Sequence, residues 1–294
     1  VGPGSLTDSG YSRVIKRWKR GQPLSRAEQV FEAQRSDVAA NASVDHTPGF
    51  ERVVFARAPD FYTSHLWLWH DGQLQAIDKP IDAELSFWRD QVLLELRSDW
   101  HVGGKTWPRG ALLIAPAKAY LAGAREFQAL FTPTATRALA GFSFTREHVL
   151  VNLHDKVAGR AEAWARVDGR WQGQPIPAPF PGNLSVHGLH NPELGAGDPL
   201  AEAFSVSYTD FLTPDTLSLG RVNAGPLELL KSRPRYFASE GMRVEQQFAV
   251  SKDGTQVPYF VVWPQGAKAD GNNPTLLYGY GGFEVPLNPW YSGA

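Results

Sequence analysis

A glycine-rich turn near the end of the sequence carries the residues best suited to chemistry. The stretch from Leu276 to Phe283 reads LLYGYGGF, so an apolar run enters a turn with three glycines. These glycines would let the backbone bend tightly and approach other groups closely. Tyr280 lies between two of these glycines and would present its hydroxyl from a rigid support. A donor that stabilises an oxyanion has to be held rigidly in this way. Phe283 would add an apolar wall, although a buried structural loop fits the same pattern.

The sequence contains no motif for the serine nucleophile that such an oxyanion-stabilising turn would accompany. A serine nucleophile on an α/β-hydrolase sheet needs the pentapeptide G-x-S-x-G, because its flanking residues must fit a strained elbow. The nearest match is GFSFT, centred on Ser143, which fails at its last position, so we expect Ser143 to be structural. The turn itself is neither a dinucleotide fingerprint nor a P-loop. Glu284 stands where the third glycine should be, and no Gly-Lys-Ser/Thr follows.

The other polar residues indicate neither a metal nor a cofactor. His187 and His190 stand three residues apart among Pro, Gly and Asn, with Glu193 as the nearby carboxylate, so we expect a surface loop. His65 and His70 flank LWLW and are expected at strand ends. The sequence has no cysteine, which excludes disulfides, thiolate metal sites and cysteine nucleophiles. A cysteine-free chain suits either redox compartment, and we favour the cytoplasm, with the periplasm as the alternative.

Charge and hydropathy argue against nucleic-acid and membrane partners. Lys and Arg total 29 and Asp and Glu total 30 in 294 residues, for a formal net charge of −1. This balance leaves no electrostatic footprint for nucleic acid or an anionic membrane. No apolar run approaches the ~18 residues that a membrane span needs. We interpret the basic run RVIKRWKR, residues 13–20, as a strand with one charged face.

The elements that must position the turn are mostly short strands. Four β-rich units begin near Val53, Val92, Val149 and Phe204, at spacings of roughly 40 to 57 residues that are typical of four-stranded propeller blades. A β-sandwich with irregular loops is the alternative. One short helix is predicted over residues 26–34, because Ser25 and the glutamate three residues later have capping-box spacing.

The pattern changes after Pro234. Residues 244–266, VEQQFAVSKDGTQVPYFVVWPQG, predict two strands around an Asp253-Gly254 turn, which is a strong hairpin signal. After a polar loop, TLLYGYGGF is predicted to be a buried strand that runs into the glycine turn. We therefore place a domain boundary near residues 233–243.

Three motifs after this boundary closely resemble the prolyl oligopeptidase family of serine peptidases. They are SKDGTQVPYFVV at residues 251–262, LLYGYGGF, and NPWYS at residues 288–292. Residues 2–24, GPGSLTDSGYSRVIKRWKRGQPL, also resemble a propeller segment of this family. The oligopeptidase B subgroup tends to have Gly-Ser-Tyr where this chain has Gly281-Gly282-Phe283, so the prolyl subgroup fits better.

The resemblance implies a mainly β fold in two parts. Residues 1–235 would form the later blades of a seven-bladed β-propeller, and residues 236–294 would begin an α/β-hydrolase peptidase domain. Tyr280 resembles the family's oxyanion-hole donor, and Phe283 resembles part of the pocket that packs against the substrate's proline ring. The implied partner is a short proline-containing peptide, and the oligomeric state stays open.

The resemblance also implies where the catalytic triad lies. In the family, Ser, Asp and His come after the YGYGGF turn, so we expect this chain to be an internal fragment that is inactive by itself. Its parent would be a serine peptidase that cleaves short peptides after proline. The alternative from a different functional class is a non-catalytic β-propeller binding module.

Overall fold

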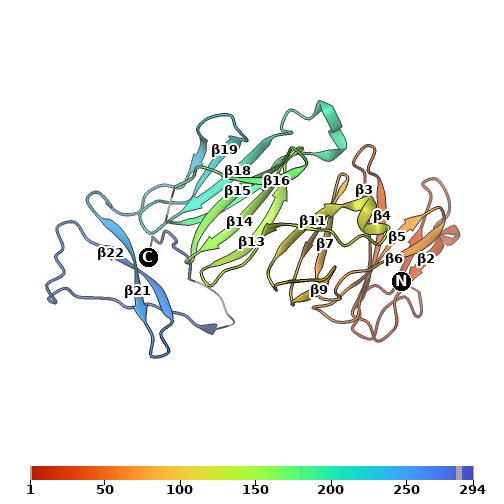
Figure 1. Cartoon of the computed structure of the whole chain (residues 1–294), viewed down its shortest axis with the longest axis horizontal. Coiled ribbons are helices and arrows are strands. Elements are labelled where there is room, and N and C mark those ends of the chain that lie inside the picture. The colour runs from red at the N-terminus through yellow and green to blue at the C-terminus, as the bar shows by residue number, and fades with distance from the viewer. Residues whose placement is uncertain (1, 180, 283–286, 294) are drawn as a thin grey trace. The chain divides into compact units, whose positions relative to one another are not determined.

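The computed structural model describes residues 2–179, 181–282 and 287–293 and consists mostly of antiparallel strands (Figure 1). Four four-stranded and three two-stranded sheets make up this described part. The chain divides into two compact units, residues 1–132 with 192–195, and residues 133–191 with 196–294. Within the described residues, no helix is long and apolar enough to cross a membrane.

The first unit contains two four-stranded sheets and two hairpins. One sheet has the order β3-β4-β5-β6, formed by β3 (Ala39–Asp45), β4 (Arg52–Ala58), β5 (His65–His70) and β6 (Gln73–Ile77). The other has the order β12-β11-β8-β7, formed by β7 (Glu84–Trp88), β8 (Gln91–Glu95), β11 (Leu112–Pro116) and β12 (Gln128–Phe131). The remaining elements are β1 (Val14–Arg17), β2 (Glu28–Glu32), β9 (Trp100–Val102), β10 (Lys105–Trp107), the 3₁₀ turn η1 (Leu24–Arg26) and the helix α1 (Ala117–Leu121).

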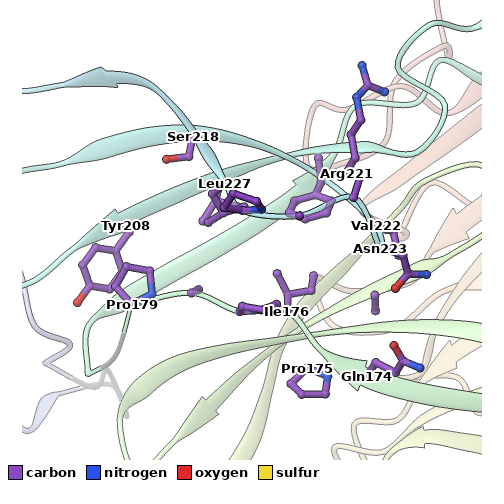
Figure 2. Close-up of a pocket in the computed structure, with 18 of the residues that line it drawn as sticks. Gln174, Pro175, Ile176, Pro179, Tyr208, Ser218, Arg221, Val222, Asn223 and Leu227 are labelled. Carbon is purple, nitrogen blue, oxygen red and sulfur yellow. The ribbon is translucent and has the colours of Figure 1, made fainter.

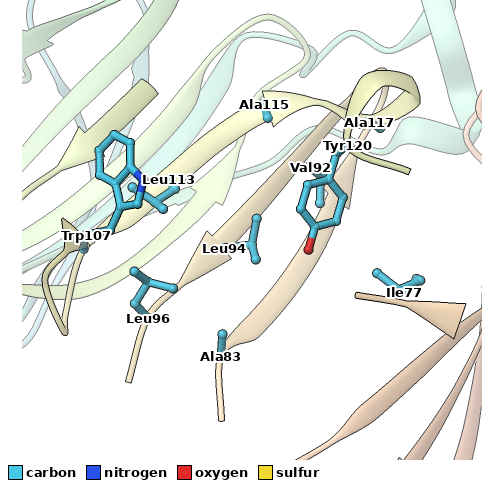
Figure 3. Close-up of a cluster of buried hydrophobic side chains, with 11 residues drawn as sticks. Ile77, Ala83, Val92, Leu94, Leu96, Trp107, Leu113, Ala115, Ala117 and Tyr120 are labelled. Atoms are coloured by element: carbon cyan, nitrogen blue, oxygen red, sulfur yellow. The ribbon is translucent and has the colours of Figure 1, made fainter. Parts of the chain in front are cut away.

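The core of the first unit is built on the central strands β8 and β11. Their apolar runs are buried on both faces of the sheet, because successive strand residues point to opposite sides. On one face, Val92 and Leu94 of β8 join Tyr120 of α1 and Ile77 of β6 (Figure 3). Side chains of β4 and β5 pack against the same cluster, so the two four-stranded sheets stack face to face.

The second unit repeats this arrangement with simpler connections. Each of its two four-stranded sheets follows sequence order, with β13 (Arg137–Phe144), β14 (Val149–Asp155), β15 (Ala158–Val167) and β16 (Arg170–Pro175) in one and β17 (Asn183–Gly188), β18 (Ala203–Thr209), β19 (Thr216–Arg221) and β20 (Glu228–Ser232) in the other. A kinked 3₁₀ segment, η2 (Pro192–Gly197), precedes β18, and its residues 192–195 belong to the first unit. In the second unit, β21 (Arg243–Val250) pairs with β22 (Gln256–Trp263).

The two sheets of the second unit are joined by side chains that replace strand pairing. The Asn152 amide of β14 donates to the Val186 carbonyl of β17 at 2.9 Å, and its oxygen accepts from the Val186 amide at 2.8 Å. The Ser143 hydroxyl of β13 accepts from the Gly188 amide at 3.0 Å. These contacts satisfy buried backbone groups that a neighbouring strand would otherwise bind. Ser143 is therefore structural, as the sequence predicts.

The predicted repeat is confirmed, with a shift in where each unit starts. The four predicted starts fall on β4, β8, β14 and β18, and each of these is the second strand of a four-stranded sheet. The first strands were not predicted because their compositions are mixed, as in AANASVD of β3 and NLSVHG of β17. Each sheet joins strands that follow one another along the chain, apart from the β9–β10 hairpin, which agrees with propeller blades.

The predicted helix over residues 26–34 is wrong. This stretch begins at the last residue of η1 and contains β2, which pairs with β1 so that Glu28 lies opposite Arg17. Phe31 of β2 is only 8% exposed, and its ring stacks on Phe55 at a centroid distance of 5.2 Å. Strand pairing and burial of this ring outweigh a local capping pattern, as tertiary contacts often outweigh helix propensity.

Two other local predictions are confirmed, and a third only in part. β5 runs from His65 to His70, so both histidines stand at strand ends. The basic run forms a strand only over β1, and its exposed residues, Lys16 and Arg17, are consecutive, so they do not form one charged face. The predicted hairpin is β21–β22, and Gly254 has the positive φ of 84° that a tight turn favours.

Candidate functional site

The glycine-rich turn lies on the surface of the described chain. Leu276 and Leu277 are 92% and 93% exposed, and no strand forms over residues 274–282. The prediction of a buried strand at this point is therefore wrong. A strand needs partners for its backbone groups and a covered face for its apolar side chains, and no described strand pairs with this run.

Tyr280 is the predicted site residue that the structure describes. Its side chain is 55% exposed, and its hydroxyl has no hydrogen-bond partner among the described residues. The ring lies over Gly282, where an added Cβ would collide with the phenol, so the glycine lets the ring fold back. Gly279 and Gly281 face open space. Phe283, the predicted wall of the proline pocket, lies outside the described residues.

A threonine, a histidine and a glutamate meet in the second unit. The Thr145 hydroxyl donates to the Glu202 carboxylate at 2.8 Å, and His148 Nδ1 lies 2.8 Å from the same oxygen. A catalytic triad needs the carboxylate on one ring nitrogen and the hydroxyl on the other. Here both partners lie on the Nδ1 side, and Thr145 is fully buried, so the cluster holds the fold and does not activate a nucleophile.

The charge on this cluster is set by its hydrogen bonds. Burial by itself raises the pKa of Glu202, but hydrogen bonds from His148 and Thr145 outweigh that effect and leave the pKa below its ordinary value. Glu202 is therefore an anion at neutral pH, paired within the fold. Among the described residues, no group of three or more His, Cys, Asp or Glu side chains is placed to hold a metal ion.

His190 forms a buried hydrogen-bonded pair with Asp198, so the prediction that it lies in a surface loop is wrong. Its Nδ1 is 2.6 Å from Asp198 Oδ2, and the two side chains are only 8% and 3% exposed. Asp198 also accepts hydrogen bonds from the backbone amides of Asn191 and Leu200. The sequence analysis considered only Glu193 as a partner; the aspartate eight residues after His190 was the signal that it missed.

This pair makes stability depend on pH. Burial acts to raise the pKa of Asp198, but the hydrogen bonds from Leu200, His190 and Asn191 outweigh it and hold the pKa below its ordinary value of 3.8. The unfolded chain then binds more protons in acid, so the free energy of unfolding should fall as the pH drops from roughly 5 to 2. We expect Asp198→Asn to be less stable at neutral pH and to lose less stability on acidification. Urea unfolding over this pH range measures both effects, and an unchanged slope in the variant would contradict the assignment.

Comparisons with known proteins show that the chain is similar to proteins named as peptidases. No protein-family model matches it. An uncharacterized peptidase, y4nA, of Sinorhizobium fredii is 32% identical over 300 residues, which cover 99% of this chain and 40% of that protein. A prolyl endopeptidase of Elizabethkingia meningoseptica is 35% identical over 117 residues, which cover 40% of this chain and 16% of that protein.

A solved structure extends the similarity to the fold. A post-proline cleaving enzyme from Rickettsia typhi matches 99% of this chain and 42% of its own, with a TM-score of 0.79 and 26% sequence identity. The chain thus spans about 40% of the length of the relatives that match it from end to end.

Proposed function

The chain belongs to the prolyl oligopeptidase family of peptidases, and on this basis we propose that it supplies part of a serine peptidase that cleaves short peptides after proline. Residues 1–235 would contribute propeller blades that restrict access to the site, and residues 236–294 would begin the α/β-hydrolase domain. The observation that carries the proposal is Tyr280 of the YGYGGF motif, which stands between glycines and whose hydroxyl has no hydrogen-bond partner within the described residues.

In the proposed mechanism a triad performs the nucleophilic attack, and this turn stabilises the oxyanion. A serine would attack the carbonyl carbon of the peptide bond that follows proline, and a histidine would accept the serine's proton. The carbonyl oxygen then becomes an oxyanion, which the Tyr280 hydroxyl would stabilise together with a backbone amide. Phe283 would pack against the proline ring. This chain contains no G-x-S-x-G pentapeptide, so in this proposal the serine would come from sequence outside it.

Substrate preference tests the proposal. In a protein that carries this chain together with the triad, we expect the kcat/KM for a blocked Gly-Pro nitroanilide to be at least about 10-fold higher than that for its Gly-Ala analogue. Each methylene that an apolar pocket accommodates strengthens binding of the transition state. The 294-residue chain alone should release no nitroaniline.

Two outcomes would contradict the proposal. Equal cleavage after alanine, or faster cleavage after arginine, would remove the post-proline specificity. The competing interpretation, a non-catalytic binding module, predicts no turnover whatever the length of the protein.

A further inference from the structure

A large cavity separates the two four-stranded sheets of the second unit. It has a volume of about 1270 Å³, and we call it the wedge. One wall comes from β15, β16 and residues 176–179, and the other comes from β18, β19 and the residues that lead into β20 (Figure 2). This volume exceeds the usual ~300–1,000 Å³ of a small-molecule site and has room for several amino-acid residues.

The surface of the wedge is mostly apolar and rigid. Ile176 lies at its centre, with Leu227 on the facing sheet (Figure 2). Three prolines, at 175, 177 and 179, alternate along one wall and line the cavity. Since a proline has a fixed φ and few side-chain rotamers, this wall loses little entropy when a ligand binds.

Every ionisable side chain that lines the wedge is engaged elsewhere. Asp210 accepts from the Tyr208 hydroxyl at 2.8 Å and from two backbone amides. His148 is held by Glu202, and the Arg221 guanidinium donates to the Pro199 carbonyl at 3.2 Å. In Figure 2 the Arg221 side chain points away from the cavity. Asp210 keeps its negative charge, because its partners are neutral, and no lysine or arginine among the described lining residues points into the wedge.

Neutral hydrogen-bonding groups remain available in the wedge. Within the described residues, the side chains of Gln172, Gln174, Ser218 and Asn223 have no hydrogen-bond partner. Figure 2 shows Gln174 and Asn223 toward one end of the view, on opposite walls. A carboxamide both donates and accepts, which is the pattern that a peptide group presents in return.

We propose that the wedge binds a short, neutral peptide segment with apolar side chains. The carboxamides of Gln174 and Asn223 would bind its backbone, while its side chains would cover Ile176 and Leu227. An acidic segment would be disfavoured, because no lysine or arginine among the described lining residues points into the wedge to pair with it and burial would remove its hydration. This proposal concerns binding only and stands whether or not the parent cleaves after proline.

Calorimetry with the 294-residue chain tests the proposal. The probes are N-acetyl-Ala-Pro-Ala-amide and its charged counterpart, N-acetyl-Asp-Pro-Asp-amide. We expect a Kd on the order of 0.1 mM for the neutral probe, from the usual affinity per ligand atom, and binding at least about 10-fold weaker for the charged one. Undetectable binding of the neutral probe at millimolar concentration, or equal affinity for both probes, would overturn the proposal.

Three variants locate the binding. Asn223→Ala, at an exposed position, should weaken the neutral probe by about 5-fold, the effect of one hydrogen bond. Asn183→Ala, an exposed asparagine of the same unit that does not line the wedge, should leave the Kd unchanged. Ala165→Trp, which fills the cavity from β15, should abolish binding while circular dichroism still reports the native fold. If Ala165→Trp does not fold, Asn223→Ala still tests whether the neutral probe binds in the wedge. Equal affinity of the probe for Asn223→Ala and for the unmodified chain would mean that the probe binds elsewhere.

Discussion

Replacing Tyr280 with phenylalanine is expected to lower kcat by about 10-fold to 10³-fold in an active peptidase that carries this chain, the range for losing one oxyanion-hole donor. The change removes a single hydroxyl and keeps the ring that folds over Gly282. The hydroxyl would bind the oxygen more strongly once it carries charge in the transition state, so kcat should fall while KM changes little. Steady-state kinetics on a proline nitroanilide separates the two parameters.

A neighbouring tyrosine provides the matched control for this experiment. Tyr278 lies two residues earlier in the same turn and is 71% exposed. Tyr278→Phe removes the same atom and should leave kcat within about 2-fold. If Tyr280→Phe also leaves kcat unchanged, Tyr280 has a structural role and the proposed oxyanion hole must use other donors.

The second large effect concerns the packing of two sheets against each other. Gly188 ends β17 and approaches β13 so closely that an added Cβ would overlap the carbonyl oxygen of Phe144. Since a backbone carbonyl cannot rotate away as a flexible side chain can, Gly188→Ala must push the two strands apart. That movement would also break the hydrogen bond from the Gly188 amide to Ser143. We expect a loss of at least about 3 kcal/mol in the free energy of unfolding, or failure to fold.

Urea unfolding of the purified chain measures this loss, with Gly197→Ala as control. Gly197 belongs to the same unit, is exposed, has no heavy atom within 4 Å of an added Cβ and does not have a positive φ. Its substitution should change the free energy of unfolding by less than about 0.5 kcal/mol. Wild-type stability in Gly188→Ala would mean that the two sheets do not approach as closely as the structure indicates.

Local sequence patterns were reliable where structure depends on neighbours along the chain. The Asp253-Gly254 turn and its flanking strands form as predicted, because a tight turn is specified by a few consecutive residues. The spacing of the apolar runs near Val92 and Val149 likewise indicated repeated sheets, because each run belongs to a central strand with several buried apolar residues in succession. In contrast, the first strand of each sheet has a mixed composition, and its pattern is correspondingly weak.

Errors arose where burial or pairing involves residues that are distant in sequence. Residues 26–34 have good helix-capping signals, yet β2 within this stretch pairs with β1 and the Phe31 ring stacks on Phe55 of β4. The apolar run at Leu276 suggested a buried strand, but burial requires a partner sheet, and none lies against it in the described chain.

The sequence by itself determined the family, through the YGYGGF turn and the motifs beside it, and it excluded cysteine chemistry. It also identified Tyr280 as the donor to test, because glycines on both sides of a tyrosine are a local feature. The tertiary structure alone decided that His190 is paired with Asp198 and that Gly188 must be glycine. It alone revealed the wedge, since the two walls of this cavity come mainly from residues 163–179 and residues 204–229 in different sheets, and no local pattern records which side chains face each other across it.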